Sequence, residues 1–420
     1  MPRQMKDSGI EWIGEIPVNW NIGRVKHGFF RKKTEAHQDN PVVLSLARSG
    51  VKIRDMSKAE GQFAESYYNY NPVVPGDLLL NPMDLYSGAN CSISKVEGVI
   101  SPAYINLGNK EGYNPVYYDY YFKTQYWAMA MFAHGKGISF DNRWTLGAGD
   151  LMNYYIPVPT LSDQMKIASY LDEMCKQIDG VIEKTRNSIE EYKQLKKAVV
   201  TQAVTKGISG NREMKDSNIE WLSMIPAEWD ECRIKNVIFP TDKPIKESDE
   251  IITCLRDGEV TLRKNRREDG FTISFTEHGY HGVDVGDLAI HGMDAFAGAI
   301  GCSDSRGKTT PVVHICTTSG NNRYFMYFLR AMAYGDILMD LSNGVRIRSS
   351  DYRNFSKLAV FKIAVPSIEE QNEIVDYLDS KTAQIDVLIS KKDAFAAELE
   401  NYKKSMIYEY VTGKKEVPQS

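Results

Sequence analysis

A sixteen-residue phrase that occurs twice limits the fold of this chain more than any other feature. Residues 5–20 read MKDSGIEWIGEIPVNW, and residues 214–229, which begin 209 positions later, read MKDSNIEWLSMIPAEW. Two more pairs of segments follow in the same order: PGDLLLNPMDLYSGA (75–89) with VGDLAIHGMDAFAGA (285–299), and IPVPTLSDQMKIASYLDE (156–173) with IAVPSIEEQNEIVDYLDS (363–380). Solenoid repeats have periods of about 20–50 residues, so this much longer spacing indicates a duplicated domain pair.

Each half has the same internal order, a mixed region followed by a long periodic segment. Short apolar runs between turn residues predict strands at 41–47, 77–80, 249–255 and 287–290. Helices are expected near 117–133 and 322–334. We therefore expect an α+β fold with two similar heads, each a mixed sheet plus helices.

The two long segments have the alternating four- and three-residue apolar spacing that is typical of coiled coils. The first predicted seam contains Ile167, Leu171, Met174, Ile178, Val181, Thr185, Ser188, Tyr192, Leu195 and Val199. The second contains Ile374, Leu378, Ile385, Leu388, Phe395, Leu399, Tyr402 and Met406. Helices of about 40–45 residues would be about 60–68 Å long.

Each apolar seam needs a partner, which could be the other copy in the same chain or a second chain in a homodimer. Two equal halves that pack around a pseudo-twofold axis would run their helices antiparallel, and we favour this arrangement. The predicted segments are a first head at 1–160, a spacer helix at 161–210, a second head at 211–366 and a second spacer helix at 367–420.

The bulk composition sets only broad limits. A chain of 420 residues with 42% hydrophobic and 25% charged residues is expected to form two to four soluble domains. Its six cysteines include no CxxC pair, and its N-terminus lacks a secretory signal, so we expect a cytoplasmic protein. The net charge of −4 does not exclude DNA binding, because a local basic stripe is sufficient.

Three stretches resemble chemical motifs without matching them. GCSDSRGKTT (301–310) departs from a phosphate-binding loop because Cys302 stands where glycine is required. NPMD (81–84) departs from the Asn-Pro-Pro-aromatic motif of amino-methyltransferases, and His278, His281 and His291 lack an obvious Cys or carboxylate partner for a metal. We therefore expect no catalytic site, no metal site and no cofactor in this chain.

Two matched pairs of basic stretches are candidates for DNA contacts. A predicted strand–turn–strand carries Arg48, Lys52 and Arg54 in the first half, and Arg256, Arg263, Lys264 and Arg266 in the second. The loops before the long helices carry Lys136 and Arg143 in the first half, and Arg346 and Arg348 in the second. Such side chains can contact phosphates or base edges, and Tyr67, Tyr68, Tyr70 and Tyr86 could stack on bases. The alternative is that these stretches are ordinary solvated hairpins and loops.

Taken together, the repeated phrase, the PGDLLL and VGDLAI strands, and the PVP…DQ and AVP…EQ helix starts resemble the specificity subunits of type I restriction–modification systems. The resemblance covers nearly the whole chain and includes LKKAVVTQAVTKG (195–207) against YKKSMIYEYVTGK (402–414). It departs at Asp163-Gln164, where the pattern usually reads Glu-Gln, as Glu370-Gln371 does.

The resemblance implies a non-catalytic subunit that recognises a split sequence in double-stranded DNA, one half with each head. The spacer helices would set the gap and bind two methylation subunits, which carry S-adenosylmethionine and methylate adenine. Motor–nuclease subunits would join for cleavage. Two other readings stay open: a coiled-coil scaffold that assembles partners without reading DNA, and a self-contained DNA enzyme.

Because both heads would carry the repeated phrase while reading different bases, the phrase itself is expected to be a docking segment. Trp12, Ile16, Pro17 and Trp20 would anchor each head against the helix that precedes it. For the second head this is the helix at 162–205. For the first head the pseudo-twofold axis would make it the C-terminal helix, which would bring the two chain ends together.

Overall fold

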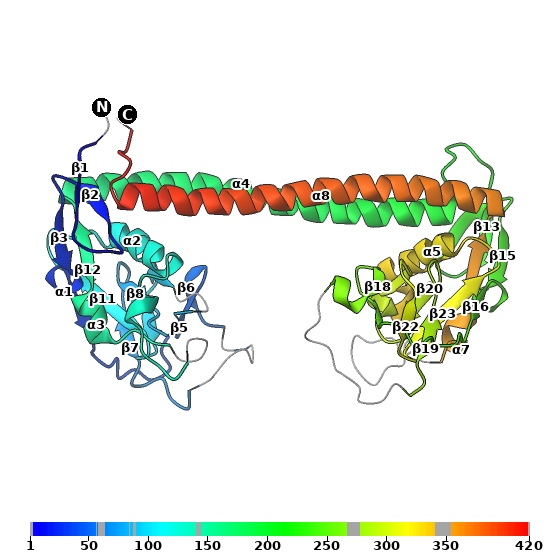
Figure 1. Cartoon of the computed structure of the whole chain (residues 1–420), viewed down its shortest axis with the longest axis horizontal. Helices are drawn as coiled ribbons and strands as arrows, with labels where there is room; N and C mark the ends of the chain where they lie inside the picture. The colour runs from blue at the N-terminus through cyan, green and yellow to red at the C-terminus, as the bar shows by residue number, and fades with distance from the viewer. Residues whose placement is uncertain are drawn as a thin grey trace. The chain divides into compact units, whose positions relative to one another are not determined.

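The computed structural model describes residues 3–55, 57, 64–83, 85–86, 90–139, 144–266, 278–340 and 354–418. The chain folds into two compact units, Met1–Thr185 with Ala394–Ser420, and Arg186–Asp393 (Figure 1). Each unit therefore contains one head and a part of both long helices, α4 (Leu161–Lys206) and α8 (Ile368–Val411). The four segments predicted from the sequence separate heads from helices, whereas these units divide both helices near their middles.

The first unit is built from short strands. They are β1 (Met5–Asp7), β2 (Glu15–Pro17), β3 (Asn21–Arg24), β4 (Phe29–Lys32), β5 (Leu44–Ala47), β6 (Gly50–Ile53), β7 (Asn71–Val73), β8 (Leu78–Leu80), β9 (Cys91–Ile93), β10 (Gly98–Ile100), β11 (Ile105–Asn109) and β12 (Tyr155–Val158). Its remaining helices are α1 (Val25–Gly28), α2 (Pro115–Trp127), α3 (Ala148–Asn153) and the 3-10 turn Phe132–His134.

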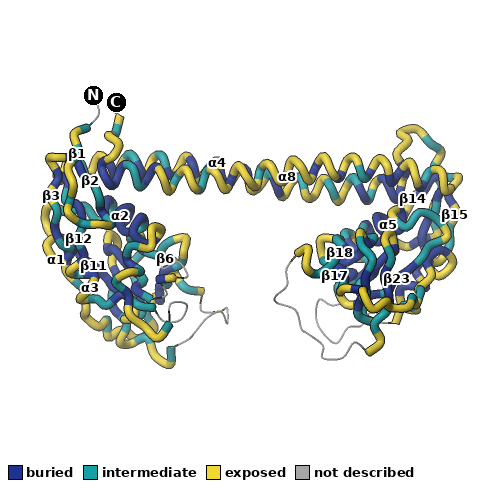
Figure 2. The backbone as a smooth tube through the Cα atoms, in the orientation of Figure 1, coloured by how far each residue is buried: buried dark blue, intermediate teal, exposed yellow. Residues whose placement is uncertain are grey.

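An antiparallel sheet in the order β4-β11-β8-β9 separates two cores of the first head. Side chains alternate between the faces of a strand, so Leu78 and Leu80 enter the large core beneath α2, while Leu79 enters a smaller core. The hairpin β5-β6 contributes Leu44 and Leu46 to that smaller core. Figure 2 shows the resulting pattern of buried and exposed segments.

The second unit repeats this order. Its strands are β13 (Met214–Ile219), β14 (Leu222–Pro226), β15 (Asp230–Arg233), β16 (Ile238–Pro240), β17 (Ile252–Cys254), β18 (Val260–Leu262), β19 (His281–Val283), β20 (Leu288–His291), β21 (Ile300–Cys302), β22 (Gly307–Thr309), β23 (Val313–Thr318) and β24 (Lys362–Val365). Its helices are α5 (Asn322–Tyr334), α6 (Ile337–Asp340), α7 (Ser356–Ala359) and the 3-10 turns Ile234–Asn236, Arg263–Asn265 and Ala295–Ala297. The sheet β16-β23-β20-β21 corresponds to that of the first head, and the helices expected near 117–133 and 322–334 are present as α2 and α5.

The repeated Gly-Asp-Leu sequence has a structural role in both heads. The Asp77 carboxylate accepts a hydrogen bond from the Val74 backbone N–H at 3.1 Å and pairs with the Lys32 ammonium at 2.6 Å. Asp287 likewise accepts from the Asp284 backbone N–H at 2.8 Å and pairs with Lys243 at 2.7 Å. These contacts fix the turn before the central strand, which is the kind of role expected of a buried carboxylate.

The glutamine at the start of each long helix joins the helix to its head. The Gln164 side-chain oxygen accepts from the Asn114 backbone N–H at 2.8 Å, and its amide donates to the Pro159 carbonyl at 3.0 Å. Gln371 makes the matching bonds to Asn321 N–H at 2.9 Å and to the Pro366 carbonyl at 3.0 Å. Because Asn114 and Asn321 are the N-caps of α2 and α5, one amide side chain holds two helix starts together.

The repeated phrase packs against a helix end in both units, as predicted. Trp20 is fully buried in a core that includes Ile407 and Val411 of α8, and Trp229 is fully buried in a core that includes Val204 of α4. In the first unit this contact brings the chain ends together, and the Arg3 guanidinium lies 3.5 Å from the Glu416 carboxylate.

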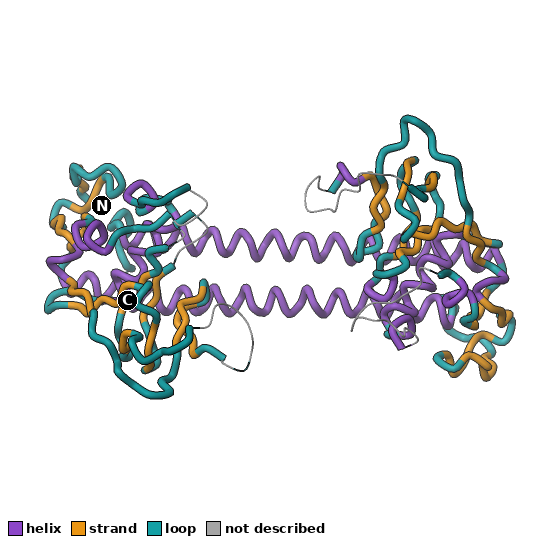
Figure 3. Tube along the Cα trace, turned by 90° about the horizontal axis from the view of Figure 1, so that it is seen from below, coloured by secondary structure: helices purple, strands orange, loops and turns teal. Residues whose placement is uncertain are grey.

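The two long helices lie side by side within each unit (Figure 3), and their contacts show that they run antiparallel. In the first unit, the Lys403 ammonium of α8 lies 2.5 Å from the Asp179 carboxylate of α4. In the second unit, the Lys196 ammonium of α4 lies 2.6 Å from the Asp386 carboxylate of α8. In each unit the residue numbers fall along one helix as they rise along the other.

The predicted seam residues differ in their burial. Of the seam residues expected to carry the interface, Leu195 is 48% exposed. Three residues that directly follow a predicted seam position, Cys175, Ile182 and Ile189, are buried on α4, whereas Val181 is 43% exposed. On α8, Leu388, Phe395 and Tyr402 are likewise 41–54% exposed.

Other predicted seam residues are buried or partly buried. Ile167, Leu171 and Ile178 of α4 are buried, as are Ile374, Leu378 and Ile385 of α8, and Leu399 packs partly buried against the first core. At these positions, the residues chosen from the heptad spacing are the ones on the buried face of each helix.

One matched pair of side chains differs between the units. In the second unit, the Trp229 indole N–H donates to the Glu370 carboxylate at 2.9 Å. The matched residue in the first unit is Asp163, which is shorter by one methylene. Within the described part of the chain, the buried Trp20 indole N–H has no hydrogen-bond partner.

We expect Asp163→Glu to stabilise the first unit by about 1 kcal/mol, because a hydrogen bond to a charged acceptor would replace an unsatisfied buried donor. Urea unfolding followed by tryptophan fluorescence measures this change. The reverse exchange, Glu370→Asp, should destabilise the second unit, and Glu369→Asp at the neighbouring exposed position is the control. A stability unchanged in both directions would contradict this explanation.

Candidate nucleic-acid interface

The first predicted basic hairpin forms as expected and exposes two of its three cations. Lys52 lies on the edge strand β6 with an exposed side chain, and Arg48 is exposed in the turn. The Asn90 amide donates to the carbonyls of Ala47 and Arg48 at 3.0 and 3.2 Å, which holds the turn in place. Arg48 and Arg54 each already interact with another group of the protein.

The second predicted hairpin also forms, but its cations are paired with carboxylates. The Arg256 guanidinium lies 2.8 Å from Asp294, the Lys264 ammonium lies 2.6 Å from Glu250, and Arg266 contacts both Asp257 and Glu259. The side chains of these three cations are 45–66% exposed. Arg263 follows β18 and also interacts with another group of the protein.

These exposed ion pairs leave the hairpin able to bind an anion. Surface ion pairs contribute only about 0–1 kcal/mol, so a phosphate could replace the carboxylates at little cost. The two hairpins share a backbone frame but carry different charged residues, and in the second hairpin carboxylates lie beside Arg256, Lys264 and Arg266.

The second pair of predicted loops is only partly described. Lys136 is 80% exposed, and its ammonium lies 3.4 Å from the Asp150 carboxylate. The backbone groups of Lys136 and Thr145 exchange hydrogen bonds of 2.9 and 3.0 Å, which fixes the base of the loop. Arg143, Arg346 and Arg348 lie outside the described residues.

Two exposed apolar or aromatic side chains accompany these cations. Tyr86 is 62% exposed, and Ile138, two residues beyond Lys136, is 86% exposed. Tyr86 could be named from the sequence as a candidate DNA contact, but Ile138 could not. A single isoleucine between glycines and polar residues carries no signal of exposure. Tyr68 is 45% exposed, whereas Tyr67 and Tyr70 pack against each other with ring centroids 5.1 Å apart.

The stretch that resembles a phosphate-binding loop is part of a sheet. Residues 301–310 include the end of β21 and all of β22, rather than a loop that opens a helix. Its Arg306 binds the Asp249 carboxylate at 2.7 Å and the Asp284 carboxylate at 2.5 Å. The Lys243 and Arg306 cations lower the pKa of Asp284 to about 2, so this cluster stays ionised and holds neighbouring strands together.

Two of the three histidines named as possible metal ligands, His281 and His291, contact the backbone. A ring nitrogen of His281 lies 2.9 Å from the Val313 carbonyl, and His291 accepts a hydrogen bond from the Asp294 backbone N–H at 3.1 Å. Burial lowers the pKa of His291, which favours the neutral ring that can accept this bond. Across the described ranges, no group of three or more His, Cys, Asp or Glu side chains is arranged to hold a metal ion, and no helix could cross a bilayer.

Comparisons with known proteins agree with this architecture. No family model matches the chain. The EcoBI type I restriction enzyme specificity subunit of Escherichia coli is 23% identical over 297 residues, which cover 63% of this chain and 59% of that protein. A putative MjaX type I restriction enzyme specificity subunit of Methanocaldococcus jannaschii is 22% identical over 432 aligned positions, with 96% of this chain and 95% of that protein covered.

A solved structure has the same fold. A chain from a study of complex assembly and conformational transition in the type I restriction–modification system superposes with a TM-score of 0.67. It is 14% identical in sequence, and the match covers 95% of this chain and 99% of that chain. In sequence, this chain is thus similar to specificity subunits of type I restriction enzymes, which confirms the resemblance found from its motifs.

Proposed function

We propose that the chain is the non-catalytic specificity subunit of a type I restriction–modification complex and recognises a bipartite sequence in double-stranded DNA. The observation that carries this proposal is a duplicated frame with two different exposed surfaces. The contacts of Asp77, Gln164 and Trp20 recur in the second unit as those of Asp287, Gln371 and Trp229. The two hairpins on that frame carry different charges, as two readers of different half-sites would.

In this proposal, phosphate contacts set the position of each head and groove contacts select bases. The exposed residues Lys52, Tyr86 and Ile138 are the best placed candidates in the first head. Arg256, Lys264 and Arg266 are the candidates in the second head, where binding would exchange carboxylates for phosphates. The proposed DNA-contact set also includes the other predicted cations: Arg48, Arg54, Lys136, Arg143, Arg263, Arg346 and Arg348.

The matched ion pairs on the long helices fit an antiparallel spacer pair. Asp179–Lys403 in the first unit and Lys196–Asp386 in the second are the same contact, because 207 residues separate Asp179 from Asp386 and Lys196 from Lys403. A rod of 44–46 residues would be about 66–69 Å long, and its pseudo-twofold axis would place the half-sites about 34 Å apart on the DNA.

Two exposed apolar patches support the binding of two identical partners. Val181 and Tyr402 are exposed in the first unit, and Leu195 and Leu388 in the second. Each residue stands one position before a seam residue, so antiparallel packing places both members of a patch on the same side of the helix pair. Because 207 residues separate Val181 from Leu388 and also Leu195 from Tyr402, the two patches correspond. We assign them to two methylation subunits that carry S-adenosylmethionine, with motor–nuclease subunits joining for cleavage.

The alternative, a coiled-coil scaffold that does not read DNA, would account for the helices but not for the two differently charged hairpins. Sequencing of methylated bases in cells that express this chain with its methylation subunit separates the two. The proposal expects one split motif, methylated at adenine on both strands. Methylation without sequence preference, or methyl transfer by this chain alone, would overturn it.

We expect Lys52→Ala to weaken DNA binding of the assembled complex uniformly across sequences. Loss of one phosphate contact should lower the slope of log K against log salt by about 0.9. A salt series with a fluorescent duplex measures the slope. Lys6→Ala, in the repeated docking phrase, is the matched control and should leave the slope unchanged, and an equal slope in both variants would remove Lys52 from the interface.

We also expect Leu388→Glu to remove one partner copy and Tyr402→Glu to remove the other, because each places a charge in an apolar contact. Native mass spectrometry should show complexes with one methylation subunit for each single variant and none for the double variant. Ala383→Glu, which is exposed on the other side of α8, is the control. Full occupancy by two subunits in the double variant would exclude these patches as the docking surface.

A further inference from the structure

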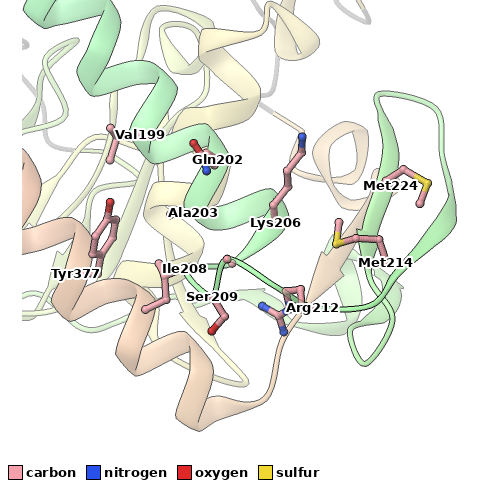
Figure 4. A pocket seen from close by; sticks show the side chains of 12 residues that line it. Val199, Gln202, Ala203, Lys206, Ile208, Ser209, Arg212, Met214, Met224 and Tyr377 are labelled. Atoms are coloured by element: carbon pink, nitrogen blue, oxygen red, sulfur yellow. The ribbon is translucent and has the colours of Figure 1, made fainter.

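A cavity of about 460 Å³ opens in the second unit, at the junction of the head with the helices (Figure 4). The last turns of α4, the linker that follows it, the hairpin β13-β14 and one side chain of α8 form its walls. We call it the Tyr377 socket, after the α8 residue, and its apolar lining consists of Val199, Ala203, Ile208, Met214, Met224 and Tyr377.

The first unit shows what fills the matched position. There the Tyr410 ring is buried against Tyr170, with ring centroids 4.7 Å apart and the two hydroxyls 3.3 Å apart. The residue 207 positions after Tyr170 is Tyr377, and the residue 207 positions before Tyr410 is Ala203. The socket therefore lies where the second copy has a methyl group in place of the phenol ring of the first.

The socket continues the exposed patch of the second unit. Tyr377 and Leu388 are eleven residues apart on α8, which is about three helical turns, so they share one face. Tyr377 is 36% exposed, and Ile208 and Met224 beside it are 38% exposed. A partner that covers Leu388 on this face of α8 could therefore also contact the socket.

The charges around the socket select the chemistry of its occupant. Lys206 lines it with an exposed side chain, and Arg212 lines it while bound to Glu370 and Glu228. None of the described residues that line the socket is acidic. Glu370 and Glu228 neutralise Arg212, so Lys206 is the cation here that is placed to pair with a carboxylate of an occupant. The apolar walls match an aromatic ring.

On the basis of the proposed function, we infer that the Tyr377 socket receives an aromatic side chain, flanked by a carboxylate, from one of the two methylation subunits. Tyr410 supplies the equivalent ring from within the chain in the first unit. The two partner copies therefore bind inequivalent sites, and the copy on the second unit has an additional aromatic anchor. Buried aromatic anchors of this kind dominate the energy of protein interfaces.

The test is a titration of the methylation subunit into the full-length chain, followed by native mass spectrometry and calorimetry. The wild-type chain should bind two copies with different dissociation constants. Ala203→Tyr, which copies Tyr410 into the second unit, should weaken the tighter step about tenfold and leave the other step unchanged. Met224→Glu, at a 38% exposed rim position, should weaken the same step if Ala203→Tyr does not fold. Ala103→Tyr, in an exposed turn of the first head, is the control.

Two equal sites in the wild-type chain, or unchanged binding in both Ala203→Tyr and Met224→Glu, would overturn the inference and leave the proposed function standing. A wild-type chain that binds no methylation subunit would overturn both.

Discussion

The structure depends on the packing of one buried tryptophan in each head against the end of a long helix. In the second unit, Trp229 and Val204 are close in sequence as well as in space. In the first unit, Trp20 shares a core with Val411, so nearly the whole chain lies between the two. Loop-closure entropy grows only with the logarithm of loop length, which makes this long closure affordable. It also means that the first core cannot be completed before the last helix has formed.

Most of the fold could be predicted from the sequence because duplication repeats its signals. The α+β heads, the long helices and the docking of the repeated phrase all followed from matched blocks. The sequence did not predict which helix face would be buried along the whole seam. Each helix has a second apolar stripe, one residue before the buried stripe. Val181 and Ile182 look equally apolar in the sequence, and only the packing distinguishes the exposed stripe from the seam.

The proposed DNA surface was less predictable, for a different physical reason. Cations could be assigned to hairpins from turn residues and charge, and Lys52 and Arg256 do lie there. The carboxylate that pairs with Arg256 could not be predicted from the sequence. Asp294 lies 38 residues from Arg256 and contacts it only because of the tertiary fold. A sequence therefore indicates where cations cluster. The electrostatic potential at a bound phosphate also depends on carboxylates that are distant in the sequence and close in the fold.

Differences between the two copies indicate which parts of the frame serve different purposes. Divergence at the hairpins is what two different half-sites would require. The exchange of Tyr410 for Ala203 cannot have that cause, because it lies in the last turns of the long helices, away from either hairpin in the chain. A buried ring lost without compensation would only cost stability. A cavity that opens beside an exposed apolar patch is instead expected where a partner supplies the missing group, so the asymmetry points to the assembly rather than to the DNA.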